Sequence, residues 1–106
     1  MKNIGMIVAV EIDAVLEKYG SRLEEQFVDG FTVNVLKNDN YTLYICKTGA
    51  GEIAAAAGTQ LLISKFGVDF VINFGVVGGL TEDMSKTKTA IVEKVVHYDF
   101  DTSAID

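Results

Sequence analysis

The sequence contains no proline and a single cysteine, Cys46, among its 106 residues. One cysteine excludes an internal disulfide and a cysteine-based zinc site, and it fits a protein of the reducing cytoplasm. The apolar, alternating segment around Cys46 favours a buried structural thiol over a nucleophile. The chain also lacks internal repeats, low-complexity tracts and linkers. It is therefore predicted to form a single domain over residues 1–106.

Basic residues and long apolar runs are also scarce. Nine Lys and Arg against fifteen Asp and Glu give a formal net charge of −6, which disfavours nucleic acid and anionic membranes as partners. No apolar run approaches the roughly 18 residues of a membrane span. The apolar residues 4–10 lead directly into Glu11 and Asp13 without the cleavage site of a signal peptide. We therefore expect a soluble, cytoplasmic protein with no nucleic-acid or membrane partner.

The hydrophobic pattern predicts an α/β fold. Residues 4–10 and 69–77 have the continuous apolar character of strands buried on both faces. Period-two alternation runs from residue 26 to residue 47, and the turn signal Asn38-Asp39-Asn40 divides it into a hairpin of residues 31–37 and 41–47. Two apolar strands, each tied to a helix, together with this hairpin predict an α/β sheet with an antiparallel insertion.

Two helices are predicted between the strands. The amphipathic segment 11–23 forms the first, which Gly20 ends or weakens. The second covers residues 52–66 and ends at Gly67. Its apolar residues occur on most sides of the helix, so it is predicted to lie buried between two layers. After a polar loop at residues 81–88, residues 89–101 are predicted to form another strand.

The segment Gly49-Ala50-Gly51-Glu52-Ile53-Ala54 matches the G-x-G-x-x-A pattern of dinucleotide-binding turns. However, the strand before it is a hairpin arm. Asp69, the acid about twenty residues later, begins a strand, whereas a ribose-binding acid should follow one. A tight strand-to-helix turn that leaves backbone amides at a pocket is therefore favoured, and a nicotinamide or flavin site is the alternative.

Two groups of polar residues have both a functional and a structural interpretation. Glu11 and Asp13 follow the first strand at the edge where α/β sheets bind ligands. They also suit the positive end of a helix dipole, and the residues alone favour this second interpretation. His97, Asp99 and Asp101 alternate as metal ligands on a strand would. A loop capped by carboxylates is the favoured interpretation, and we expect no metal site.

The segment FGVVGGL, residues 74–80, ends the second apolar strand. Its glycines permit either a tight corner in the core or a backbone-lined pocket at the carboxyl end of the strand. It has no side chain capable of catalysis. From the residues alone, both interpretations stay open.

Three segments occur in an order and spacing that resemble one family: IGMIVAVEIDAVL, KTGAGEIAAAAGTQLLISKFGVDFVINFGVVGGL and HYDFDTSAID. The chain resembles the purine nucleoside and uridine phosphorylase superfamily, and within it most closely the 5'-methylthioadenosine/S-adenosylhomocysteine nucleosidases. The resemblance implies the N-terminal part of a three-layer α/β/α fold with a mixed sheet and a β-hairpin insertion. It also implies cofactor-free hydrolysis of the N-ribosidic bond of a purine nucleoside.

The resemblance assigns roles to individual residues. Asp13 falls where the family has the glutamate that positions the attacking water, and it is one methylene shorter, about 1.5 Å less in reach. Val10 falls on the sugar side of the site, and Val77 and Gly78 on the backbone beside the purine. The remaining substrate-binding assignments are Ala50 in the glycine turn, Val76 where the family has a small hydroxyl residue, and Thr102 and Ile105 on a loop that reaches the neighbouring subunit in family dimers.

Family members have more than twice this length, and the resemblance implies that the general acid and the ribose-binding carboxylate lie in the other half. A truncated, inactive half-domain that binds nucleosides or self-associates is therefore one alternative, and a nucleoside phosphorylase is another. Strands that the other half would cover should leave apolar edges and faces exposed. We accordingly expect a homodimer or another homo-oligomer.

Overall fold

The structure is a computed structural model that describes residues 2–76, 79–86 and 89–95. The chain divides into two compact units, Met1–Val76 and Val77–Asp106. The prediction of one domain over residues 1–106 stays a prediction.

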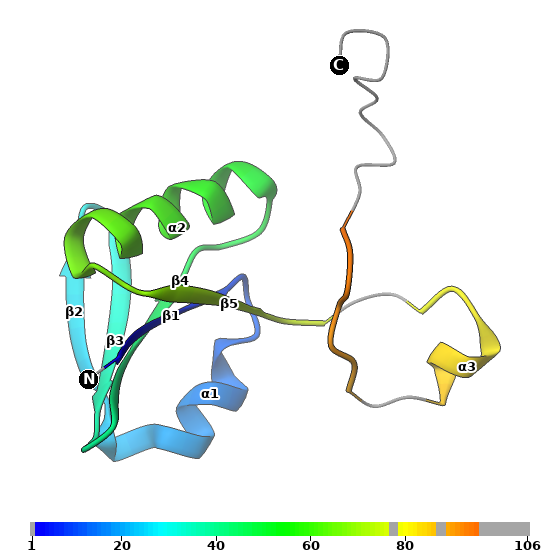
Figure 1. The fold of residues 1–106 in the computed structure, drawn as a ribbon, viewed down its shortest axis with the longest axis horizontal. Helices are drawn as coiled ribbons and strands as arrows, with labels where there is room; N and C mark the ends of the chain where they lie inside the picture. The colour runs from blue at the N-terminus through cyan, green and yellow to red at the C-terminus, as the bar shows by residue number, and fades with distance from the viewer. Residues whose placement is uncertain (1, 77–78, 87–88, 96–106) are drawn as a thin grey trace, which may run out of the picture. The chain divides into compact units, whose positions relative to one another are not determined.

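The first unit contains one mixed sheet and two main helices (Figure 1). Its elements are β1 (Lys2–Val8), α1 (Ile12–Tyr19), a 3₁₀ turn (Gly20–Arg22), β2 (Glu24–Val28), β3 (Phe31–Lys37), β4 (Tyr41–Lys47), α2 (Glu52–Phe66) and β5 (Phe70–Phe74). The strand order is β2-β3-β4-β1-β5. β1 runs parallel to β4 and β5, whereas β3 runs antiparallel to β2 and β4. The predicted mixed sheet with an antiparallel hairpin is confirmed.

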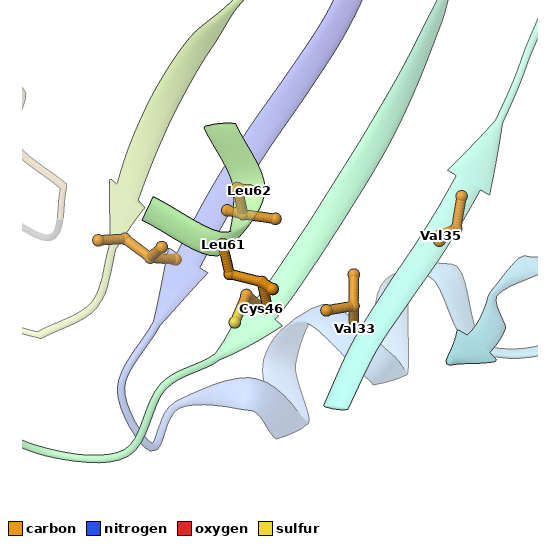
Figure 2. Packing of buried hydrophobic residues seen from close by; sticks show 6 residues of the cluster. Val33, Val35, Cys46, Leu61 and Leu62 are labelled. Atoms are coloured by element: carbon orange, nitrogen blue, oxygen red, sulfur yellow. The ribbon is translucent and has the colours of Figure 1, made fainter. Parts of the chain in front are cut away.

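The two helices cover opposite faces of this sheet, as Figure 1 shows. Neighbouring residues Ile7 and Val8 of β1 contribute to different core clusters because successive side chains of a strand point to opposite faces. On one face, α2 supplies Leu61 and Leu62, which pack near Cys46 (Figure 2). On the other face, α1 supplies buried Ile12 and Val15. The predicted α/β/α layering is confirmed.

Both helices of the first unit end at glycines. Gly20 follows α1 with a φ of 31°, so the predicted helix over residues 11–23 ends earlier, at Tyr19. Gly67 follows α2 in the left-handed conformation, with φ 60°, and its N–H donates to the Leu62 and Ile63 carbonyls. The predicted helix end at Gly67 is therefore confirmed.

The prediction that α2 lies sandwiched between layers is wrong for the part of the chain that the structure describes. Ile53 is 84% exposed, and Ile63 is also exposed. Burial of Leu61 and Leu62 anchors one face of the helix on the sheet, and nothing described covers the opposite face.

The apolar strand predicted over residues 69–77 is present as β5, but its burial differs from the prediction. β5 lies at the edge of the sheet, and Phe70, Ile72 and Phe74 are exposed. The prediction that this strand is buried on both faces is therefore wrong for the first unit. The expectation that apolar edges and faces are left exposed is confirmed.

In the second unit, the described residues 79–86 and 89–95 include one short helix, α3 (Glu82–Ser85), where a loop was predicted. The Thr81 hydroxyl caps it by accepting the Met84 N–H at 3.2 Å. Residues 89–95 form no strand, so that part of the predicted strand is wrong, and residues 96–101 lie outside the described ones. No helix in the described ranges has the length and apolarity needed to cross a membrane.

Candidate functional site

Three parallel strands end at the same edge of the sheet. Val8, the last residue of β1, pairs with Lys47 at the end of β4 and with Phe74 at the end of β5. The chain leaves β1 for the helix on one face and β4 for the helix on the other. Open α/β sheets bind ligands in the crevice at such a switch between faces. This edge is therefore the candidate site.

The loop between β4 and α2 is held against the end of β1. The Thr48 N–H donates to the Val8 carbonyl at 2.9 Å, and the Gly49 N–H donates to the Ala9 carbonyl at 3.0 Å. Gly49 and Gly51 adopt φ values of 83° and 101°, which other residues adopt at a cost. The predicted tight strand-to-helix turn is confirmed, and it places exposed Ala50 at the candidate site. The Gly49 amide is already bonded to the protein.

A second glycine sets how closely α2 approaches β4. A Cβ on Gly58 would overlap the side chain of Thr48 and would lie 3.3 Å from Sγ of Cys46. Gly58 therefore allows α2 to pack directly on the carboxyl end of β4. This packing sets the position from which the turn at Gly49–Gly51 starts.

Glu11 has a contact that the sequence analysis did not anticipate. Its side chain makes no capping hydrogen bond to α1, although the residue occupies the N-cap position. Instead, Oε2 accepts the Val10 N–H at 3.3 Å and lies beside Gly75, which follows β5. The carboxylate therefore lies between the ends of β1 and β5. The favoured interpretation of Glu11, through the helix dipole, missed this position, whereas the alternative placed it at the correct edge of the sheet.

Asp13, the predicted catalytic residue, lies in the first turn of α1 with an exposed side chain. Val10 and Val76 are exposed on the segments that follow β1 and β5. Together with Ala50, these residues all lie on segments that leave the carboxyl ends of the three parallel strands. Their common location is what the functional interpretation requires.

The other predicted site residues, Val77, Gly78, Thr102 and Ile105, lie outside the described part of the chain. The same is true of His97, Asp99 and Asp101, which were considered as possible metal ligands. Within the described residues, no three His, Cys, Asp or Glu side chains group as metal ligands. A separate hollow of about 340 Å³ is lined by Asp29, Phe31, Ala57, Gln60, Leu61, Ser64 and Lys65. None of the predicted site residues lines this hollow.

Cys46 is fully buried in the core on the α2 face of the sheet. Burial raises the pKa of its thiol, so the reactive thiolate is disfavoured. The predicted structural role of this cysteine is confirmed.

Comparison with curated proteins gives long matches to one group of enzymes. The 5'-methylthioadenosine/S-adenosylhomocysteine nucleosidase of Marinomonas sp. is 32% identical over 104 residues, which are 97% of this chain and 45% of that protein. The corresponding nucleosidase of Geobacillus kaustophilus is 35% identical over 91 residues, 86% of this chain and 39% of that protein. The chain thus spans less than half the length of these relatives.

Solved structures agree with these matches. A variant of the Helicobacter pylori nucleosidase with 5'-methylthioadenosine in its active site aligns with a TM-score of 0.71 at 27% identity, covering 78% of this chain and 37% of that chain. The Colwellia psychrerythraea nucleosidase in complex with adenine gives a TM-score of 0.67 at 31% identity, covering 77% and 34%. The family profile described as the phosphorylase superfamily matches residues 4–106. The resemblance seen in the sequence is confirmed, and the chain belongs to the phosphorylase superfamily.

Proposed function

We propose that this chain is the N-terminal part of a nucleosidase that hydrolyses the N-ribosidic bond of 5'-methylthioadenosine or S-adenosylhomocysteine. The observation that carries the proposal is the meeting of β1, β4 and β5 at one edge, because it gathers the segments that bear Val10, Asp13, Ala50 and Val76. The relatives named above are nucleosidases, and two of their structures hold 5'-methylthioadenosine or adenine. These ligands support a purine nucleoside as the substrate.

Hydrolysis of an N-ribosidic bond requires a water held in line with the anomeric carbon and a carboxylate that takes its proton. Asp13 is the proposed carboxylate, and its exposed side chain is accessible to water and substrate. Because an aspartate reaches about 1.5 Å less far than a glutamate, we expect the water to be held less effectively.

The proposed nucleoside lies across the ends of the strands. Val10 lines the sugar side, and its exposed side chain offers an apolar contact there. The backbone of Val77 and Gly78 forms the proposed wall beside the purine, and Val76 stands where the family has a small hydroxyl residue near the attacking water. Ala50 approaches the substrate from the glycine turn, and Thr102 and Ile105 are assigned to the pocket of a second subunit. The cytoplasmic location and the homo-oligomer belong to the same proposal.

A second candidate is a half-domain that binds a nucleoside or self-associates without catalysis. The chain corresponds to 45% of the Marinomonas nucleosidase, and one edge of a pocket supplies only some of the required groups. The proposed general acid and ribose carboxylate come from the other half. We therefore expect no adenine release by this chain alone.

Adenine release from 5'-methylthioadenosine tests the proposal. The chain is co-expressed with the part of the Marinomonas nucleosidase that follows the matched segment, and the purified mixture is assayed by chromatography with and without phosphate. We expect adenine and free methylthioribose from the mixture only. Asp13→Asn should lower the rate by about 10²–10⁴-fold, the usual contribution of a general base.

Asp39→Asn is the matched control, because Asp39 is exposed in the turn at the amino end of β4, on the opposite edge of the sheet. An unchanged rate in Asp13→Asn would contradict the role of Asp13. Methylthioribose 1-phosphate formed only with phosphate would instead identify a phosphorylase. A mixture that binds 5'-methylthioadenosine without releasing adenine would favour the non-catalytic half-domain.

A further inference from the structure

The connections that leave the carboxyl ends of β1, β4 and β5 carry one charged side chain. The described residues of these connections are 9–11, 48–51 and 75–76, and Glu11 is the single ionisable residue among them. Glu11 is half-buried, whereas Val10, Ala50 and Val76 offer only apolar side chains. The charge that these connections bring to the candidate site is therefore a carboxylate.

The carboxylate of Glu11 has an oxygen that the protein does not use. Two carbonyls at the end of β1 accept N–H groups of the loop before α2, and the Thr48 hydroxyl donates to the Gly49 carbonyl. Oε2 of Glu11 accepts the Val10 N–H, but Oε1 accepts no hydrogen bond from a described residue. One oxygen thus orients the carboxylate, and the other is available to a ligand.

Two strand ends set the position of this carboxylate. A Cβ at Gly75 would lie 3.2 Å from Oε2 of Glu11 and 3.9 Å from Oε1. The side chain is therefore bonded to the segment after β1 and lies against the segment after β5. Because Val10 is proposed to line the sugar side of the site, the carboxylate lies next to the proposed position of the ribose.

The start of α1 does not explain this position. Glu11 occupies the N-cap position of α1, yet its side chain makes no capping hydrogen bond. At the start of α3, in contrast, the Thr81 hydroxyl accepts the Met84 N–H. The contacts of the Glu11 side chain are with Val10 and Gly75 at the strand ends, and these contacts point to the site rather than to the helix.

We propose that Glu11 is a further catalytic residue, whose Oε1 contacts the ribose and stabilises the positive charge that the sugar acquires during hydrolysis. When the N-ribosidic bond breaks, its electron pair leaves with the purine, which takes a proton from the general acid of the other half. The ribose is then an oxocarbenium-like cation. Its charge disappears when the water oxygen bonds to the anomeric carbon and a proton of that water passes to Asp13.

A fixed carboxylate favours this cation over the neutral substrate. Oε2 is already held by the Val10 N–H, so the group needs little reorganisation when the charge develops. The interaction is stronger in the transition state than with the bound substrate, and it therefore raises kcat rather than lowering KM. This role of Glu11 rests on the proposed function.

Binding of two unreactive analogues of 5'-methylthioadenosine tests the proposal without turnover. In one analogue a pyrrolidine ring, whose amine is protonated at neutral pH, replaces the ribose ring, and in the other a neutral cyclopentane ring does. Both are titrated by calorimetry into the 106-residue chain and into its mixture with the part of the Marinomonas nucleosidase that follows the matched segment. We expect the cation to bind more tightly than the neutral analogue.

Glu11→Gln should lower this preference by about tenfold or more, because a hydrogen bond between two charged groups is lost. The amide oxygen of glutamine can still accept the Val10 N–H, so the structure is retained. Glu17→Gln is the matched control, since it makes the same charge change at an exposed position of α1, and it should leave the preference unchanged. If Glu11→Gln fails to fold, Gly75→Ala carries the same expectation, because the added methyl group displaces the carboxylate.

Adenine release by the mixture gives a second measurement. Glu11→Gln should lower kcat by about tenfold or more and leave KM nearly unchanged, because the charge exists only in the transition state. A loss of folded protein alone would lower the yield of active mixture without changing the relative affinities for the two analogues. The cation preference therefore separates a catalytic role of Glu11 from a structural one.

Three results would overturn the proposal. The first is an equal cation preference in Glu11→Gln and the unchanged chain, and the second is no cation preference in either the chain or the mixture. The third is adenine release at an unchanged kcat in Glu11→Gln, which leaves the nucleosidase activity standing. A Glu11-dependent cation preference in a mixture that releases no adenine would support the contact with the sugar and contradict the proposed activity, so the two proposals fail separately.

Discussion

The carboxylate of Glu11 occupies the space beside Gly75. A Cβ built on Gly75 would lie 3.2 Å from Oε2 of Glu11, and the same oxygen accepts the Val10 N–H. Glu11 follows β1 and Gly75 follows β5, so one side chain lies between the ends of two parallel strands. Any residue larger than glycine at position 75, directly before Val76, would therefore contact the Glu11 carboxylate.

Gly75→Ala should lower the free energy of unfolding by no more than about 1 kcal/mol, because the Glu11 side chain can rotate away from the added methyl group. Gly75 does not have the left-handed φ that would strain an alanine. The cost should disappear in a Glu11→Ala background. Urea unfolding of the four proteins gives this double-mutant cycle, and equal costs in both backgrounds would contradict the contact.

Gly58→Ala should destabilise the protein by about 1–3 kcal/mol, despite the better helix propensity of alanine. The added methyl group would overlap the side chain of Thr48, and the nearest atom is the Thr48 methyl group, Cγ2. Thr48→Ser removes that methyl group and keeps the hydroxyl that donates to the Gly49 carbonyl at 2.8 Å. The double variant should recover most of the loss in a urea titration. No recovery would show that the overlap with Thr48 is not the cause.

Gly67→Ala should cost about 1 kcal/mol of stability, whereas Gly67→Asn should cost less. Gly67 ends α2 at φ 60°, where alanine is disfavoured and asparagine is better tolerated. A Cβ there meets nothing within 4 Å, so the effect is one of backbone conformation alone. Thermal unfolding measures both variants, and an equal loss in the two would count against this explanation.

Cys46 makes the free energy of unfolding depend on pH in the alkaline range. Burial raises the pKa of its thiol above the ordinary 9.0, so the folded state keeps the proton that the unfolded state releases. The stabilisation is complete below pH 9.0 and is lost as the pH rises through the folded-state pKa. Unfolding free energies measured from pH 7 to pH 10.5 should therefore fall less steeply for Cys46→Ala than for the unchanged chain. Parallel curves would contradict the prediction.

Local signals in the sequence predicted the hairpin of β3 and β4 and the extent of α2, because turn residues and a terminal glycine mark their ends. β2 was not separated from the alternating segment, since Glu24-Glu25-Gln26 obscures its pattern. Its turn, Asp29-Gly30, is nevertheless a strong hairpin signal, and both residues have the positive φ of that turn. A search for such dipeptides would have found the strand.

The site was predictable where it depends on strand ends and not where it depends on distant contacts. Asp13 follows an apolar strand at the ligand edge, but the family resemblance was needed to assign site roles to it and to Val10. The contact of Glu11 with Gly75 joins residues 64 positions apart, which no local pattern encodes. The burial expected for β5 was also wrong, because a run of apolar residues does not show whether a strand lies inside a sheet or at its edge.

The position of β1 in the middle of the sheet has a consequence for biosynthesis. β1 is made before both of its neighbours, which begin at Tyr41 and Phe70. At about 5–20 residues per second, its backbone groups wait several seconds on the ribosome before both pairing partners exist. During that interval the apolar residues Ile4–Val8 of β1 have neither of the strands that pair with them in the folded sheet.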